Sequence, residues 1–293
     1  MRLVELESGP VEYLDEGDGP PVVLLHGLVM NHTQWGAVMP FLPDGFRYIR
    51  PVLPLGGHRL PMRHGADLSL DGLVRLIAEL LEALDLAGTT LVHSDWGGGL
   101  FLTAHELDTR IGRSVIFPCE VLENFPPGLP GHMARVAARI PGGLSLAARQ
   151  LRIPAMRRSS LLLGQMAKHP LPDPLIESWT HGLINSAGVR RDLRTYLTSP
   201  ISPSRLRLDT DALRYFDGST LIAWGAESRV MPPSDGRHLA ALLPCAVFVE
   251  IPDSRALPML DNPQDTARVL SDFLEARVPI TDTYFHSIST ELP

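Results

Sequence analysis

Short apolar runs alternate with amphipathic stretches along most of the chain. Continuous apolar runs of roughly four to eight residues are typical of buried parallel strands, and an apolar period of about 3.6 residues is typical of helices. On this basis we expect strands at residues 22–25, 48–52, 89–93, 114–117, 220–224 and 246–251. Apolar and polar positions alternate in residues 2–8 and 11–16, which we expect to form a hairpin. We expect helices at residues 33–42, 71–86, 97–108, 234–243 and 264–276.

This alternation predicts an α/β fold with a doubly wound, mostly parallel, eight-stranded sheet. It is interrupted once, after the sixth strand, by helical pieces that are rich in Arg and broken by Pro and Gly. We therefore expect a core formed by residues 1–120 and 215–278, with a helical cap formed by residues 121–214. Residues 279–293 form a C-terminal tail for which no pattern indicates a role.

The bulk composition narrows the class of protein. The 293 residues, 44% hydrophobic and 20% charged, fit one large globular domain or one domain with an insertion. A net charge of −7 gives no reason to expect nucleic-acid or membrane partners, and no apolar run approaches the ~20 residues of a membrane span. No pattern indicates an oligomeric state. We expect a small molecule as the partner.

Cysteine content and motifs bear on location and cofactors. Cys119 and Cys245 are the only cysteines, so the sequence has no zinc motif and no disulfide framework. The N-terminus does not resemble a signal peptide, and with the few cysteines this predicts a cytoplasmic protein. No phosphate loop, dinucleotide fingerprint or metal-ligand cluster is visible, so we expect no cofactor and no metal.

The strand at residues 89–93 runs into a tight turn that is typical of a nucleophile elbow. The central residue of such an elbow has strained backbone geometry and needs small neighbours. If Asp95 is central, the residue two places on is Gly97; if Ser94 is central, it is Trp96, which is too large. We therefore favour Asp95. The alternative role for Asp95 is to cap the next helix.

Four segments in order resemble the α/β-hydrolase superfamily over roughly residues 1–278: His26-Gly27-Leu28, Pro51 to Gly56, Ala223 to Ala226 and Leu257 to Pro263. The Asp-Trp-Gly-Gly elbow is most similar to haloalkane dehalogenases and epoxide hydrolases. That resemblance implies that Asp95 attacks carbon and forms an ester, which a His-activated water cleaves. It also implies an oxyanion hole made by the backbone N–H groups of Leu28 and Trp96.

Two positions depart from the family pattern. The family's acid would fall at Ser228 and its catalytic His near Ala256, and neither side chain can do the expected proton chemistry. Some haloalkane dehalogenases carry the acid just after the sixth strand, where this chain has Glu120. The alternative for Glu120 is a solvated residue at the hinge of the cap.

Five other side chains are candidates for contact with substrate or for the missing base. His93 lies two residues before the elbow residue, so alternation places both on one side of the strand; its alternative is a packed core histidine. His58 lies in a loop that usually borders the pocket. Asp253 ends the eighth strand, as a pocket residue or as part of a turn. His26 usually supports the oxyanion loop, and Tyr196 could protonate an alkoxide in an epoxide hydrolase.

Three functions fit this sequence, all with a small, largely apolar ligand. The first is a hydrolase that uses Asp95 and Glu120 with a base not yet identified. The second is a lyase or cyclase in which Asp95 acts as general acid or base, since burial beneath an apolar cap would raise its pKa. The third is an inactive homologue that binds an apolar ligand.

Overall fold

The computed structural model describes residues 1–122 and 124–276. The expected tail, residues 279–293, and the last two residues of the expected core lie outside the described residues. Within the part that is described, no helix is both long and apolar enough to cross a membrane.

Eight strands form one sheet, in the order β1-β2-β4-β3-β5-β6-β7-β8. The pairs β1–β2 and β2–β4 are antiparallel and all the other pairs are parallel. The fold class expected from the alternating pattern is therefore confirmed. The strands are β1 (Arg2–Leu6), β2 (Gly9–Glu16), β3 (Pro21–Leu24), β4 (Arg47–Pro51), β5 (Thr89–Asp95), β6 (Ile111–Cys119), β7 (Ser219–Gly225) and β8 (Ala246–Ile251).

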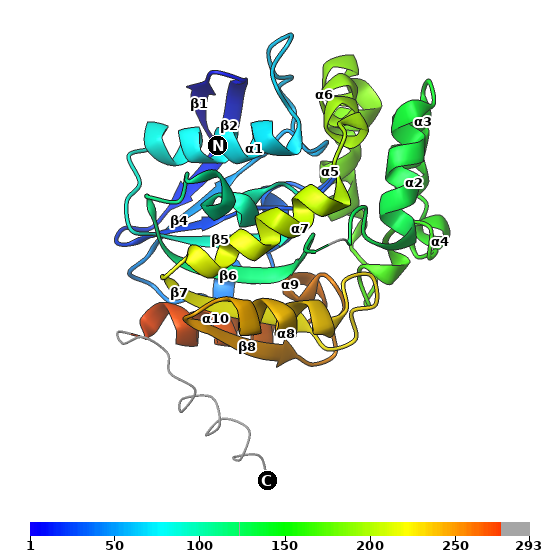
Figure 1. Ribbon diagram of the computed structural model, residues 1–293. Helices are drawn as coiled ribbons and strands as arrows, with labels where there is room; N and C mark the ends of the chain where they lie inside the picture. Colours follow the sequence, from blue (N-terminus) through cyan, green and yellow to red (C-terminus); the bar gives the residue numbers. More distant parts are fainter. Residues whose placement is uncertain (123, 277–293) are drawn as a thin grey trace.

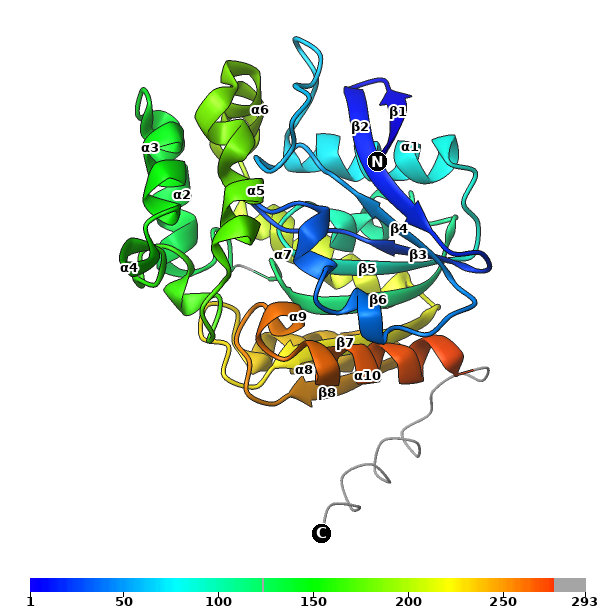
Figure 2. The ribbon, with the colours of Figure 1, turned by 180° about the vertical axis from the view of Figure 1, so that it is seen from behind.

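Helices cover both faces of this sheet (Figures 1 and 2). Helix α8 (Pro233–Leu242) lies in front of the sheet in Figure 1, and α10 (Pro263–Glu275) lies in front of it in Figure 2. Helix α1 (Leu70–Ala83) begins at Ser69, whose hydroxyl accepts the N–H of Gly72, and it buries a continuous apolar stripe. This burial on both faces explains why all seven residues of β5 are buried.

Two of the expected helices are short 3-10 helices instead of continuous α-helices. Residues 33–42 form two short 3-10 helices, η1 (His32–Trp35) and η2 (Met39–Phe41), because Pro40 lacks the N–H group that a continuing helix needs. Residues 97–108 form η3 (Gly99–Phe101) and η4 (Thr103–His105). Residues 97–99 are consecutive glycines, which have low helix propensity, and the first two have positive φ angles.

The helical segment between β6 and β7 lies at one end of the sheet, beyond the last residues of β5 and β6 (Figures 1 and 2). Helix α7 then leaves this group and crosses the front of the sheet in Figure 1. The segment contains α2 (Gly128–Arg139), α3 (Gly143–Leu151), α4 (Pro154–Arg157), η5 (Leu163–Gln165), α5 (Asp173–Asn185), α6 (Ala187–Thr198), α7 (Pro203–Ala212) and η6 (Leu213–Tyr215). The short helix α9 (Pro258–Asp261) follows β8.

Candidate active site

Asp95 is the residue at which β5 turns sharply. Its φ angle is +61°, a conformation that is uncommon for residues with a side chain. The side chain is buried, and its Oδ2 accepts the backbone N–H of Leu28 at 2.8 Å. The backbone N–H of Trp96, the next residue, lowers the pKa of this carboxyl. Ser94 points elsewhere, and its hydroxyl accepts a hydrogen bond from Gln34 at 3.2 Å.

The backbone at Gly27 packs directly against Asp95. A Cβ atom at position 27 would lie 2.3 Å from Asp95 Oδ2, so only glycine fits. Gln34 accepts the N–H of Gly27 at 2.8 Å and thereby fixes this loop. The sequence analysis missed Gln34, because a single polar residue within the helix expected at residues 33–42 gives no signal that its side chain is buried.

His26 supports the same loop. Its Nδ1–H donates to the carbonyl of Gly27 at 2.9 Å, while its Nε2 accepts the N–H of Leu53 at 2.8 Å. Burial lowers the pKa of His26 to about 3, so the ring is neutral at physiological pH. A neutral ring with both nitrogens engaged joins two loops and has no free atom for proton transfer.

The Asp95 carboxyl has an unusual protonation equilibrium. Burial raises its pKa to about 7, against the opposing effect of the Leu28 N–H. The charge of Glu120 raises the pKa further, and the Trp96 N–H and His93 lower it. Both protonation states are therefore well populated near neutral pH.

Glu120 follows β6 directly and is fully buried, which contradicts the alternative of a solvated hinge residue. Its Oε1 accepts the backbone N–H groups of Gly97 at 3.1 Å and Gly98 at 3.2 Å. Its Oε2 lies 3.5 Å from Nε2 of His93. The carboxylate therefore binds the turn that follows Asp95.

His93 does not reach the cavity side of Asp95. Neither ring nitrogen has a hydrogen-bond partner among the described residues, and Nδ1 packs closely against Gly99. This placement fits the alternative of a packed core histidine. The ring is a buried neighbour of Glu120.

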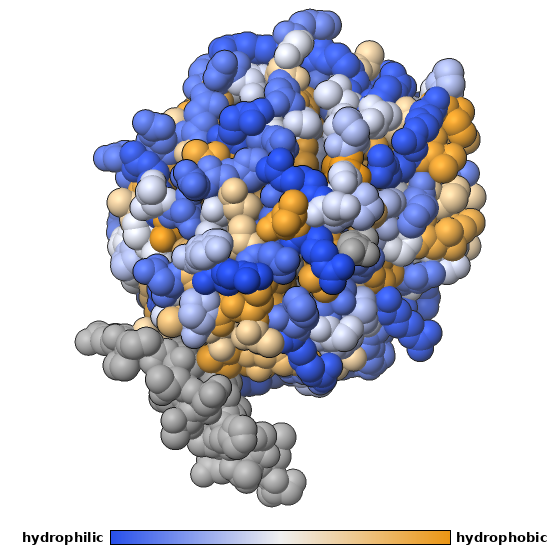
Figure 3. All heavy atoms as spheres, viewed as in Figure 1, coloured by the Kyte–Doolittle hydropathy of each residue, from blue (hydrophilic) through white to orange (hydrophobic). Residues whose placement is uncertain are grey.

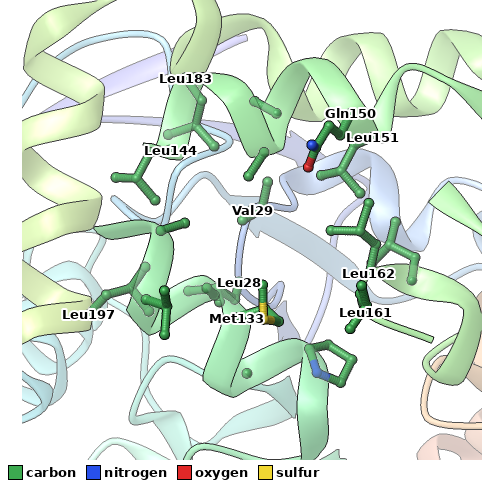
Figure 4. A pocket seen from close by; sticks show the side chains of 18 of the residues that line it. Leu28, Val29, Met133, Leu144, Gln150, Leu151, Leu161, Leu162, Leu183 and Leu197 are labelled. Carbon is green, nitrogen blue, oxygen red and sulfur yellow. The ribbon is translucent and has the colours of Figure 1, made fainter. Parts of the chain in front are cut away.

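A cavity of about 430 Å³ lies between Asp95 and the helical segment (Figure 4). Leu28 and Trp96 line its core side, and leucines from several helices project toward the same space. Gln150 and Ser159 are its uncharged polar lining residues. Among the described residues that line the cavity, Asp95 is the one ionisable side chain.

The two departures from the family pattern are both buried. Ser228 is 4% exposed and Ala256 is 0% exposed, and neither lines the cavity. The loop that carries Ala256 is joined to the helical segment, because the N–H of Leu257 donates to the carbonyl of Met166 at 3.2 Å. Met166 itself lines the cavity.

Two other candidates, His58 and Asp253, lie away from the cavity. His58 is buried with its Nε2 at 3.2 Å from Oδ2 of Asp192, so it does not border the pocket as expected. Asp253 is at the surface, where it pairs with Lys168 and His169. This position fits the alternative that Asp253 belongs to a turn. The partners of His58 and Asp253 come from distant segments of the chain, so the local sequence could not reveal these positions.

Tyr196 is buried beside the site but is not part of the cavity lining. Its ring lies 6.2 Å from that of Trp96, and its hydroxyl has no hydrogen-bond partner among the described residues. Burial raises its pKa well above the usual value, so the hydroxyl is protonated at neutral pH.

Comparison with known proteins agrees with this geometry. A haloalkane dehalogenase of Mycolicibacterium paratuberculosis is 29% identical over 238 residues, which are 77% of this chain and 74% of that protein. The pimeloyl-[acyl-carrier protein] methyl ester esterase of Methylococcus capsulatus is 27% identical over 88% of this chain and 96% of its own length. A mutant haloalkane dehalogenase from Agrobacterium tumefaciens superposes with a TM-score of 0.72 at 17% identity, covering 94% of this chain and 97% of that one.

The family described as "alpha/beta hydrolase fold" matches residues 20–263, which is most of the chain. Its relatives include dehalogenases and esterases. The chain therefore belongs to the alpha/beta hydrolase fold family, as an enzyme related to haloalkane dehalogenases and esterases.

Proposed function

We propose that this enzyme moves a proton within a small, largely apolar substrate, as a lyase or cyclase, with Asp95 as its general acid and base. The observation that carries the proposal is the cavity lining, where Asp95 is the one ionisable group among the described residues. A pKa of about 7 suits proton transfer near neutral pH.

A single carboxyl group is sufficient for such a reaction. The ionised Asp95 accepts a proton from a carbon or hydroxyl of the substrate, and the protonated form returns it to another atom of the same molecule. Asp95 ends in the state in which it began, so no second base is needed. The N–H group of Leu28 fixes the orientation of the carboxylate, and burial beneath the apolar lining favours the protonated form that returns the proton.

Hydrolysis through an Asp95 ester is the second candidate. It is supported by the two backbone N–H groups at the carboxylate, which could stabilise an oxyanion during ester cleavage, and by the dehalogenase relatives. Against it, the described lining residues offer no base to activate water, a contribution typically worth ~10²–10⁴-fold in rate.

Mass spectrometry of the intact protein separates these two candidates. The protein is exposed to alkyl halides, epoxides and activated esters in H₂¹⁸O. Proton transfer predicts no adduct on Asp95 and no ¹⁸O in any product, whereas a product containing ¹⁸O would establish the hydrolase. A stable adduct on Asp95 would show a nucleophile that cannot complete hydrolysis.

A positive test for proton transfer uses apolar compounds with an acidic C–H bond, selected because they raise the melting temperature. In D₂O the selected compound should gain deuterium with the wild-type protein and not with Asp95→Asn. Equal exchange with both proteins would contradict the proposal. Binding without exchange in either protein would indicate the inactive homologue.

A further inference from the structure

The segment between the sixth and seventh strands has a charge opposite to that of the rest of the chain. Residues 121–214 contain 13 Arg and Lys against 6 Asp and Glu, whereas the whole chain has a net charge of −7. The contrast is sharpest in residues 124–172, which contain six arginines and one lysine and no Asp or Glu. The expectation of no membrane partner was based partly on the net charge of the whole chain, which combines the basic segment with the acidic remainder.

The same stretch exposes aliphatic side chains. We call the following set the cap patch, whose members are 45–58% exposed: Leu129, Val136, Ile140, Leu146, Ile153 and Leu161. Figure 3 shows apolar residues gathered at the edge of the molecule over α2 and α3. Four of the six, Val136, Ile140, Leu146 and Leu161, also line the cavity. The patch is therefore continuous with the cavity lining.

Arginines lie on the same segment as the cap patch, and most have no acidic partner among the described residues. Arg157 pairs with Asp173 at 2.5 Å. Five others form no ion pair with any described residue: Arg135, Arg139, Arg149, Arg152 and Arg158. Exposed aliphatic groups on a segment with uncompensated cations are typical of surfaces that lie in the interface of an anionic membrane.

We infer that the cap patch docks on an anionic phospholipid surface and that apolar ligands enter the cavity from there. Hydrocarbon would meet the aliphatic side chains, while lipid phosphates would meet the arginines. A ligand dissolved in the lipid would then reach the cavity without crossing water.

Two other occupants of the patch fit the residues less well. In a two-fold dimer the same arginines would face one another, and like charges oppose such an interface. The second alternative is a different protein. The six residues of the patch are all aliphatic, whereas the centres of protein interfaces are enriched in aromatic residues. An anionic lipid surface satisfies both the charge and the aliphatic composition.

The test is co-sedimentation of the full chain with lipid vesicles. We expect binding to vesicles that contain phosphatidylglycerol, little binding to pure phosphatidylcholine, and weaker binding in high salt. The double variant Arg149→Glu/Arg158→Glu should bind phosphatidylglycerol vesicles at least about tenfold more weakly, because each basic residue near the surface contributes roughly fivefold.

Two further variants complete the experiment. Leu129→Ser/Ile153→Ser removes patch residues that do not line the cavity and should also weaken binding. The control Arg75→Glu/Arg268→Glu makes the same charge change on α1 and α10 and should bind like the wild type.

Three results would overturn the inference. The first is absence of binding to phosphatidylglycerol vesicles, and the second is equal loss in the patch and control variants. The third is self-association of the protein without lipid, measured by light scattering, that is lost in the patch variants. The patch would then be an interface between copies of this chain. Circular dichroism and melting temperature establish that each variant is folded.

Discussion

At the scale of the residue, the proposed chemistry depends on one buried carboxyl, that of Asp95. Asp95 could be identified from sequence because its neighbour Gly97 satisfies a steric rule that Ser94 fails. The surroundings of Asp95 could not be identified, because they depend on long-range contacts such as that with Glu120, 25 positions later. Local patterns reveal a strained turn, but they do not reveal which distant groups face it.

Asp95→Asn should make the protein more stable at pH 8. The pKa of Asp95 is about 7 when folded and 3.8 as its ordinary value, so folding takes up a proton between these values. The free energy of unfolding therefore falls as pH rises from about 4 to 7. Asparagine removes this penalty, and we expect a gain of at least about 2 kcal/mol, or about 4 °C in melting temperature.

Asp192→Asn is the matched control, because its effect has the opposite sign. Burial alone would raise the pKa of Asp192, but hydrogen bonds from His58, Met62 N–H and Arg191 lower it overall. Its contribution to stability is present above the ordinary pKa and is lost as pH falls through the lowered value. Asp192→Asn should destabilise the protein at pH 8. Thermal melts from pH 4 to 8 compare the variants, and a less stable Asp95→Asn would contradict the raised pKa.

At the scale of the element, the turn after β5 is held by an acceptor from the end of β6. The sequence predicted the strand and the glycine-rich turn that follows it, but it also predicted a helix at residues 97–108, which is wrong. Propensity reasoning failed because the first turn satisfies two of its N–H groups with Glu120 and continues only as short 3-10 helices. By contrast, the eight strands were predictable because apolar runs and apolar–polar alternation are local signals.

Glu120→Gln should lower the pKa of Asp95. The negative charge of Glu120 raises that pKa, and glutamine removes the charge while it keeps an oxygen to accept the two glycine N–H groups. Carboxyl-¹³C NMR titration, with the Asp95 signal assigned by its loss in Asp95→Asn, measures the change. An unchanged or higher pKa would exclude this electrostatic coupling.

Glu120→Leu separates the hydrogen bonds from the charge. It should also lower the pKa of Asp95, but it leaves the N–H groups of Gly97 and Gly98 without their acceptor. We expect a loss of roughly 1–3 kcal/mol in unfolding free energy for each buried N–H, against about 1 kcal/mol or less for glutamine. Urea unfolding compares the two variants.

At the scale of the whole molecule, a helical segment and a sheet enclose an apolar space. The position of the segment could be predicted from the single interruption of the alternating pattern. The cavity could not, because exposed and lining leucines look alike in sequence. The distribution of charge was visible in the sequence, but its meaning depended on knowing that α2 and α3 share one edge of the molecule.

Leu197→Trp should occupy part of the cavity. Leu197 lies on α6, is 2% exposed and lines the cavity (Figure 4). The larger side chain should at least halve the increase in melting temperature produced by a long-chain alcohol such as decanol, because that increase depends on ligand affinity. Leu208→Trp, a surface position at 65% exposure, is the control. An undiminished increase with Leu197→Trp would place the ligand elsewhere.

The opposite charges of the helical segment and the remainder of the chain have a kinetic consequence. Because most of the basic segment lies at one end of the sheet, we expect the molecule to have an electric dipole directed along it. In the field of a negatively charged surface such a molecule rotates before it makes contact, so that most encounters should begin with the cap patch facing the surface. Ionic strength would then govern how fast the protein arrives in a productive orientation as well as how tightly it stays.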